Sequence, residues 1–262
     1  MEPEVHAVKT LTKELAEKYF RARFSVDLAA FHYLEDEAAK IISKKENSCG
    51  LQLDGLCELS EKSAGFLARH VDSISLKGLP KISDSVAQIL AKHKGPCLFL
   101  NGLTSLSESS AEALGKYRGQ GLYLNGLANL SESSAEALGK FRNALSLQGL
   151  TEITENQAKS LAKKTSDLNL SGLKTISDEV AVALSKHKGG LLELNSLSKL
   201  SDKACENLVK HLGPLSFTGL AELSDAAFDR LKAFGDSGTA LYLSSPYFQR
   251  FKDYKSASIV RK

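Results

Sequence analysis

The dipeptide Gly-Leu returns along this chain at a nearly constant interval. Successive copies, with Ser196-Leu197 filling one gap, lie 23, 24, 24, 23, 23, 24 and 23 residues apart. A fixed period of this size predicts a solenoid, in which each repeat packs only on its neighbours. The Gly-Leu copies are Gly55-Leu56, Gly78-Leu79, Gly102-Leu103, Gly126-Leu127, Gly149-Leu150, Gly172-Leu173 and Gly219-Leu220.

The segment from Leu98 to Gly121 represents one repeat. Its opening Leu-Phe-Leu alternates and predicts a short strand with inward leucines. A turn follows, in which we expect Gly102 to take a backbone conformation that other residues avoid. The stretch after Leu106 then predicts a short amphipathic helix.

Each predicted helix begins with a hydroxyl residue followed by an acid. The hydroxyl can accept a hydrogen bond from a free backbone N–H, and the acid suits the positive end of the helix dipole. Because eight copies are more than one active site needs, we interpret these pairs as structural. The hydroxyl residues are Ser60, Ser83, Ser107, Ser131, Thr154, Ser177, Ser201 and Ser224.

The pattern extends beyond the Gly-Leu copies. A strand is expected at residues 26–28, with Ala30 in the glycine position, and a last strand at Leu241–Leu243. We therefore expect about ten strands in all. The chain should divide into three regions: an N-terminal helical half-repeat or cap (1–24), one continuous solenoid domain (25–245), and a C-terminal cap or basic tail (246–262).

The order Leu-x-Leu, turn, inward Leu and helix resembles the leucine-rich repeat family. That resemblance implies an α/β horseshoe, with a concave parallel sheet and short convex helices. The family's Asn aligns with Leu103, Leu127 and Leu150, so we expect its Asn ladder to be absent. Asn101 and Asn125, two residues earlier, are not expected to replace it. The variant is similar to short-period repeats of bacterial proteins.

Charge and cysteine content bear on partners and compartment. The net charge is +3 and residues 250–262 carry +4, which leaves 3 − 4 = −1 for the remainder. The strand positions show no basic stripe, so we expect no nucleic-acid partner. No apolar run is long enough for membrane insertion.

Neither a signal peptide nor a paired-cysteine motif is visible in the sequence. We therefore expect a cytoplasmic location and free thiols at Cys49, Cys57, Cys97 and Cys205.

No catalytic motif is recognisable, and we expect no enzyme activity, cofactor or metal. His70, His93, His187 and His211 share one repeat position with Tyr117, Phe141, Lys164 and Phe234. Zinc requires three or four ligands, and adjacent repeats offer two histidines at most. We interpret this column as packing or helix-end chemistry.

A binding surface is predicted on the concave face. The residue between the two strand leucines should point outward, and in two adjacent repeats that residue is aromatic, Phe99 and Tyr123. Asn101, Asn125 and Gln148 should line the next column. Aromatic residues beside amides are typical of interface centres. Near-identity of these two repeats leaves a second explanation open, which is accidental duplication. The prediction is a non-catalytic module that binds a protein or peptide; the alternative is a passive scaffold that uses its helical face or ends.

Overall fold

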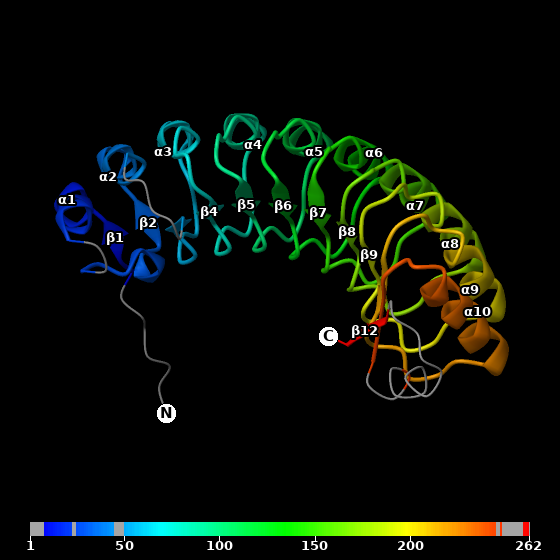
Figure 1. Ribbon diagram of the computed structural model, residues 1–262. Coiled ribbons are helices and arrows are strands. Elements are labelled where there is room, and N and C mark those ends of the chain that lie inside the picture. Colours follow the sequence, from blue (N-terminus) through cyan, green and yellow to red (C-terminus); the bar gives the residue numbers. More distant parts are fainter. Residues whose placement is uncertain (1–7, 23–24, 45–49, 245–246, 248–258, 262) are drawn as a thin grey trace, which may run out of the picture. The chain divides into compact units, whose positions relative to one another are not determined.

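The computed structural model describes residues 8–22, 25–44, 50–244, 247 and 259–261. The chain divides into two compact units, Met1–Leu124 and Asn125–Lys262, and each is described by itself. Both units repeat one arrangement, in which a short strand, a turn and a short helix lead to the next parallel strand (Figure 1). The predicted α/β solenoid of parallel strands and short helices is confirmed.

The first unit contains four strands that pair in parallel in chain order, β3 to β6. A separate parallel pair, β1 with β2, lies nearer the N-terminus. The elements of this unit are β1 (Thr10–Leu11), α1 (Lys13–Arg21), the 3-10 helix η1 (Leu28–Ala30), β2 (Tyr33–Leu34), α2 (Asp36–Ile42), β3 (Leu51–Gln52), α3 (Glu61–Leu67), β4 (Ile74–Ser75), α4 (Asp84–Leu90), β5 (Cys97–Phe99), α5 (Glu108–Leu114) and β6 (Gly121–Tyr123).

The second unit continues the pattern with strands β7 to β12, of which β7 to β11 follow the repeat and all pair in parallel. Its elements are α6 (Glu132–Gly139), β7 (Ala144–Ser146), α7 (Glu155–Leu161), β8 (Leu168–Asn169), α8 (Asp178–Leu184), β9 (Leu192–Glu193), α9 (Asp202–Leu208), β10 (Leu215–Phe217), α10 (Asp225–Asp236), β11 (Leu241–Leu243) and β12 (Ile259–Arg261).

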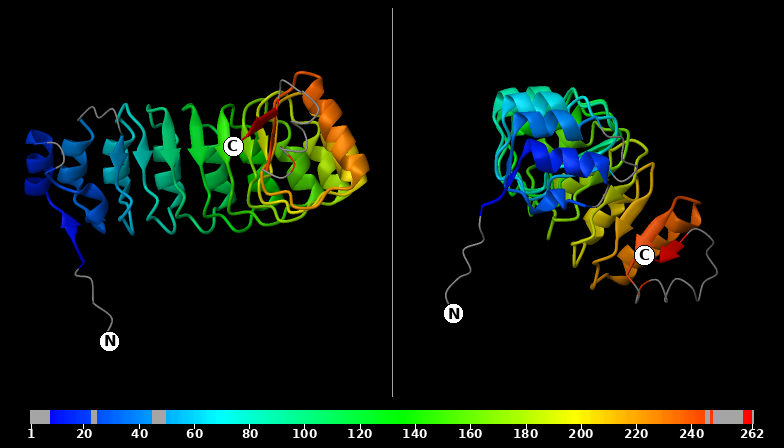
Figure 2. Two further views of the ribbon diagram at one scale, coloured as in Figure 1. Left: turned by 60° about the horizontal axis from the view of Figure 1, so that its bottom comes forward. Right: turned by 90° about the vertical axis from the view of Figure 1, so that its left-hand side faces the viewer.

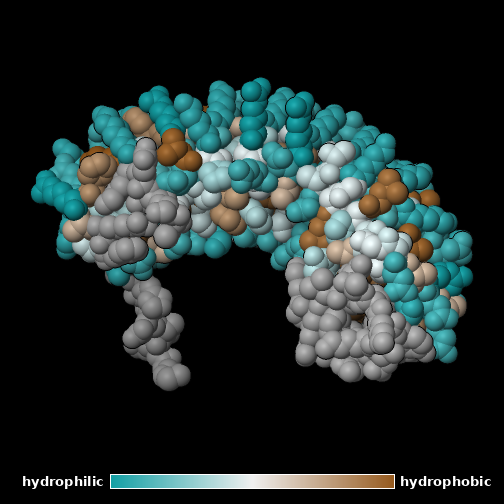
Figure 3. All heavy atoms as spheres, viewed as in Figure 1, coloured by the Kyte–Doolittle hydropathy of each residue, from teal (hydrophilic) through white to brown (hydrophobic). Residues whose placement is uncertain are grey.

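Each unit is a sheet layer backed by a helical layer. In the first unit, helices lie on one side and strands on the other (Figure 1), and the left view of Figure 2 shows the strands in front of the helices. The leucines of the repeat fill the space between the layers: Leu98, Leu100, Leu103 and Leu114 are all 0% exposed. The outer surface of the helices is mostly hydrophilic (Figure 3), as one-sided amphipathic helices require.

The predicted helix caps are all present. In α5, Ser107 Oγ accepts a hydrogen bond from the backbone N–H of Ser110 at 3.0 Å. At four caps the hydroxyl also donates a hydrogen bond to the carboxylate of an Asp that begins the preceding helix. The Asp-to-cap pairs are Asp36 with Ser60, Asp84 with Ser107, Asp178 with Ser201 and Asp202 with Ser224.

The role predicted for the repeat glycine is wrong. Among described glycines, positive φ angles occur at Gly50, Gly189 and Gly238, none of which belongs to a Gly-Leu pair. The repeat glycines instead lie against the backbone of the preceding repeat. A Cβ on Gly102 would lie 2.1 Å from the carbonyl oxygen of Lys77. Glycine at this position therefore permits two backbones to approach closely.

Both ends of the predicted strand series need correction. Residues 26–28 form no strand, because Asp27 caps η1 by accepting a hydrogen bond from the backbone N–H of Ala29 at 3.0 Å. At the other end, β11 is not the last strand, since β12 pairs with it in parallel. The remainder of the predicted C-terminal cap, apart from Tyr247, lies outside the described residues, and the domain boundaries remain predictions.

Candidate functional site

The two aromatic residues singled out in the sequence lie side by side in the first unit. Phe99 of β5 and Tyr123 of β6 are direct partners in the parallel register. Their rings stack, with centroids 4.4 Å apart and planes 16° from parallel. Both side chains are half-buried. They lie on the open face of the sheet, by which we mean the face turned away from the helices.

A small residue makes room for this stack. Gly121 precedes Tyr123 by two residues, so both positions share one face of β6. A Cβ on Gly121 would lie 2.8 Å from Cε2 of Tyr123 and 3.3 Å from Sγ of Cys97. The tyrosine ring therefore occupies space that a side chain at residue 121 would fill.

A cation and a carboxylate adjoin the aromatic pair. Lys77 Nζ lies 5.7 Å from the centroid of the Phe99 ring and 3.4 Å from Asp54 Oδ2. The ammonium is thereby placed between an anion and a π face, both of which attract it. The sequence-based prediction missed Lys77, although it occupies the same repeat position as Asn101 and Asn125.

The predicted amide residues divide between the units. Asn101 follows β5 in the first unit and is half-buried, whereas Asn125 and Gln148 belong to the second unit. Asn125 Oδ1 accepts hydrogen bonds from Ser146 Oγ at 2.7 Å and from the backbone N–H of Gln148 at 3.2 Å. The carboxamide oxygen of Asn125 thus joins its own repeat to the next.

The family's Asn position is occupied by leucine, as expected, but Asn125 does join two repeats, which was not expected. Asn195 repeats the bonds of Asn125, accepting from Ser216 Oγ at 2.7 Å and from the N–H of Thr218 at 3.1 Å. Asp54 does the same with Ser75 Oγ and with the N–H of Lys77 at 3.2 Å. At these three positions, which we call the ladder, a side-chain oxygen two residues before the family's Asn position joins one repeat to the next.

The bonds of this ladder bury several strand positions that face away from the helices. The outward strand positions Ser75, Ser146 and Ser216 are 7%, 5% and 0% exposed. Each hydroxyl donates to a ladder oxygen of the preceding repeat. These serines are therefore part of the fold, and within the first unit Ser75 is the direct strand partner of Phe99.

In the second unit, the residues of the histidine column make structural contacts. His187 Nε2 lies 2.8 Å from the carbonyl oxygen of Ser166, and Nδ1 lies 2.8 Å from Nε2 of His211. Lys164, in the same column, donates to the carbonyl oxygen of Asn143 at 2.7 Å. Burial lowers the pKa of Lys164 to about 8. The column links the helix end of one repeat to the loop of the repeat before it.

The described residues contain no group of three or more His, Cys, Asp and Glu side chains placed to hold a metal ion. Cys57, Cys97 and Cys205 are free thiols, and Cys49 lies outside the described residues. No helix in the described ranges is long and apolar enough to span a bilayer.

The repeat geometry defines the class of protein: the chain is a leucine-rich-repeat-like solenoid. No family model matches the sequence, and no curated protein matches it. Solved structures do match. One is the Toll–Spatzle complex of Drosophila, with a TM-score of 0.48, 12% identity and coverage of 76% of this chain. This chain spans only 24% of the length of that match.

Two further structures match over most of this chain. The complex of Rad7 and Elc1 in yeast has a TM-score of 0.40 and 16% identity, covering 94% of this chain and 85% of the other. An internalin, inlF, from Listeria monocytogenes has a TM-score of 0.43 and 17% identity, covering 90% and 83%.

Proposed function

We propose that this chain is a non-catalytic repeat module that binds a protein or peptide on the open face of its sheet. The observation that carries the proposal is the stacked pair of Phe99 and Tyr123 with Lys77 above Phe99. An aromatic pair with a cation at its margin offers apolar area and a polar contact in one place, as interface centres do. The cytoplasmic location and the absence of nucleic-acid partners and of enzyme activity remain predictions.

The arrangement favours an extended segment of the partner as the contacting element. Because the strands are parallel and short, the face presents one side chain per repeat at each level. A partner segment that crosses β4, β5 and β6 would meet Lys77, Phe99 and Tyr123 in turn. Stacking also holds the two rings in place before binding, which reduces the entropy lost when a partner docks.

The alternative, a scaffold that binds through its helical face, also has an observation in its favour. In the second unit, Val182 of α8 is 37% exposed and Leu212, after α9, is 79% exposed. The two are separate side chains with no established contact between them. They therefore support this alternative less strongly than the stacked rings support the first.

Alanine substitutions distinguish the two functions. Phe99→Ala and Tyr123→Ala should each weaken partner binding by about 2 kcal/mol or more, as truncation of a hot spot does. The control is Tyr242→Ala, which removes an aromatic side chain from the matching position of β11. Affinity capture with quantitative mass spectrometry would identify proteins held by the wild type, and calorimetry with the purified partner would give each affinity.

If Phe99→Ala and Tyr123→Ala both keep wild-type affinity, and circular dichroism shows that they are folded, the open face is not the binding surface. A loss confined to Val182→Lys or Leu212→Lys would instead support the helical face.

A further inference from the structure

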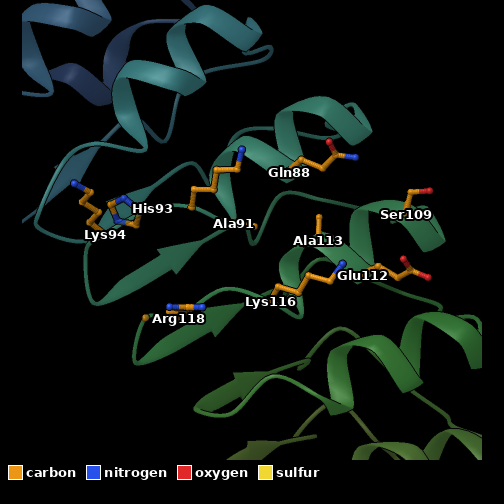
Figure 4. Close-up of a pocket in the computed structure, with 11 residues that line it drawn as sticks. Gln88, Ala91, His93, Lys94, Ser109, Glu112, Ala113, Lys116 and Arg118 are labelled. Atoms are coloured by element: carbon orange, nitrogen blue, oxygen red, sulfur yellow. The ribbon is translucent and has the colours of Figure 1, made fainter.

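A pocket of about 770 Å³ opens in the first unit between α4 and α5 (Figure 4). Gln88 and Ala91 come from α4 and its end, and Glu112 comes from α5. The loops that follow each helix complete the wall. The pocket belongs to the helical side of the unit and shares no residue with the aromatic pair on the open face.

The lining of this pocket is strongly basic. It contains four exposed cations and one carboxylate, Glu112, for a formal balance of 4 − 1 = +3. Within the described part of the chain, none of the four cations forms an ion pair within 4.0 Å. The four are Lys92, Lys94, Lys116 and Arg118.

Comparison with other repeats explains why one of these charges is unpaired. In the second unit, Lys140 pairs with Glu136 at 3.3 Å and Lys210 pairs with Glu206 at 3.8 Å, each four residues earlier. The residue four before Lys92 is Gln88, which carries no charge. The α4 repeat thus lacks the acid that pairs with this column in α6 and α9.

A buried polar side chain without a hydrogen bond of good geometry lines the same pocket. His93 is 3% exposed, and neither ring nitrogen makes such a bond, although the backbone of Asp72 and of Ala68 lies close to the ring. The neighbouring column member Tyr117 does bond, donating to the carbonyl oxygen of Gly95 at 2.7 Å. Buried nitrogens without partners are uncommon in folded proteins. His93 therefore points to a ligand that supplies the missing contact.

We propose that this pocket binds a phosphate monoester, with Lys92, Lys116 and Arg118 neutralising its charge and His93 donating an N–H to one of its oxygens. The planar guanidinium of Arg118 matches two phosphate oxygens, and the ammonium groups act as point charges. The volume exceeds that of one phosphate group, so the residue or molecule that carries the phosphate would also enter. Gln88 and Ser109 supply neutral hydrogen-bonding groups for it.

Calorimetry with three probes distinguishes the sources of the phosphate. The probes are a phosphoserine peptide, free O-phosphoserine and inorganic phosphate, with the unphosphorylated peptide as the blank. If the natural ligand is a phosphoprotein, the phosphopeptide should bind at least tenfold more tightly than free O-phosphoserine and inorganic phosphate. A small phosphorylated metabolite predicts that free O-phosphoserine binds as well as the peptide.

A matched pair of double variants tests the position. Lys92→Gln with Arg118→Gln should weaken binding at least tenfold. The control, Lys140→Gln with Arg142→Gln, removes two exposed cations from the equivalent positions around α6 and should change affinity less than twofold. Equal losses in the two double variants, or equal binding of a DNA duplex, would show only a diffuse basic surface and overturn the site.

The wild-type protein provides an independent readout at His93. Burial, and then the neighbouring His70, lower the pKa of His93 to about 4. A bound phosphate should raise that pKa and shift the His93 ring ¹⁵N resonances in an NMR titration, while those of His187 stay in place. Saturation with each probe and no change at His93 would refute its role, and no binding by any probe at millimolar concentration would refute the site.

Discussion

Ser201 and Asp178, one repeat apart, are joined by a hydrogen bond of 2.7 Å from the hydroxyl to the carboxylate. The same hydroxyl accepts a hydrogen bond from the backbone N–H of Ala204 at 2.9 Å. Asp178 also lies 3.6 Å from Lys203 Nζ. The first turn of α9 is therefore completed by a side chain from α8, and helix capping here is shared between repeats.

Asp178→Glu tests this shared cap. The variant keeps the negative charge at the start of α8, but the extra methylene group should carry the carboxylate past Ser201 and break the 2.7 Å hydrogen bond. We expect a loss of about 0.5–1 kcal/mol in the free energy of unfolding, the net value of an exposed hydrogen bond. Urea denaturation followed by circular dichroism would measure it.

The reverse substitution, Glu61→Asp, provides the matched control. Glu61 occupies the same position in α3, one repeat before the cap hydroxyl of Ser83. Shortening it should create the missing bond and stabilise the protein by a similar amount. Destabilisation by both changes would mean that side-chain length at this position does not control the cap.

Gly102→Ala should destabilise the protein, because the added methyl group meets the carbonyl oxygen of Lys77. Overpacking of this kind costs about 1–3 kcal/mol. Gly65→Ala in α3 is the comparison, since a Cβ there has nothing within 4 Å. Alanine favours the helix at residue 65, so that change should stabilise by about 0.5–1 kcal/mol. Thermal melts with the same sign for both variants would contradict the close approach.

Stability should fall in acid through His187 and His211. Burial lowers the pKa of His187 to about 4, and burial also lowers the pKa of His211. The unfolded chain, with ordinary values near 6.5, then binds more protons between pH 6.5 and 4. Stability is accordingly complete above about pH 6.5 and is lost as the pH falls toward 4, by about 3 kcal/mol for His187.

The contacts between His187 and His211 also predict that stability falls as the pH is lowered. His187 Nδ1 and His211 Nε2 lie 2.8 Å apart, a contact that holds one proton, so charging both rings would place two N–H groups against each other. Lys164 nearby opposes the extra charge, and Asp167 partly favours it. Replacing both histidines by Phe, which occupies this column at residues 141 and 234, should reduce the difference in urea midpoint between pH 7 and pH 5. An unchanged difference would exclude the pair as its source.

The three described thiols should react at different rates with a disulfide reagent in the native protein. Cys57 is exposed, Cys97 is half-buried and Cys205 is buried. Burial raises the pKa of Cys205 to about 12, so its reactive thiolate is scarce at neutral pH. We expect the order Cys57, Cys97, Cys205, measured on single-cysteine variants. Rapid modification of Cys205 would show that α9 opens readily.

The repeat period was sufficient to predict where most strands and helices lie, because spacing determines which residues share a column. Ser107 and its equivalents were correctly predicted as caps, since a cap bond is local to its own helix. The role of the glycine was wrong because the constraint on Gly102 comes from the carbonyl oxygen of another repeat. A sequence shows periodicity more directly than it shows distances between neighbouring backbones.

The candidate binding site could also be predicted only in part. The adjacency of Phe99 and Tyr123 followed from the register, but the contribution of Lys77 depends on a side chain that reaches across a strand. The basic pocket could not be predicted from the strand pattern, because its lysines follow the helices, although Lys92 and Lys116 recur with the repeat period. The poor hydrogen-bond geometry of His93 depends on distances between repeats, and the same column gives His187 a contact of 2.8 Å.

The hydrogen-bonded ladders have a consequence for how a chain of this kind changes length. Asp178 bonds a hydroxyl 23 residues later, and Asn195 bonds one 21 residues later. Removing part of a repeat would leave such donors opposite the wrong partners. Removing the whole repeat that contains Ser201 would bring Asp178 opposite Ser224, an equivalent hydroxyl. Insertion or deletion of a whole repeat therefore keeps equivalent positions opposite one another, which makes the repeat the natural unit of change in length.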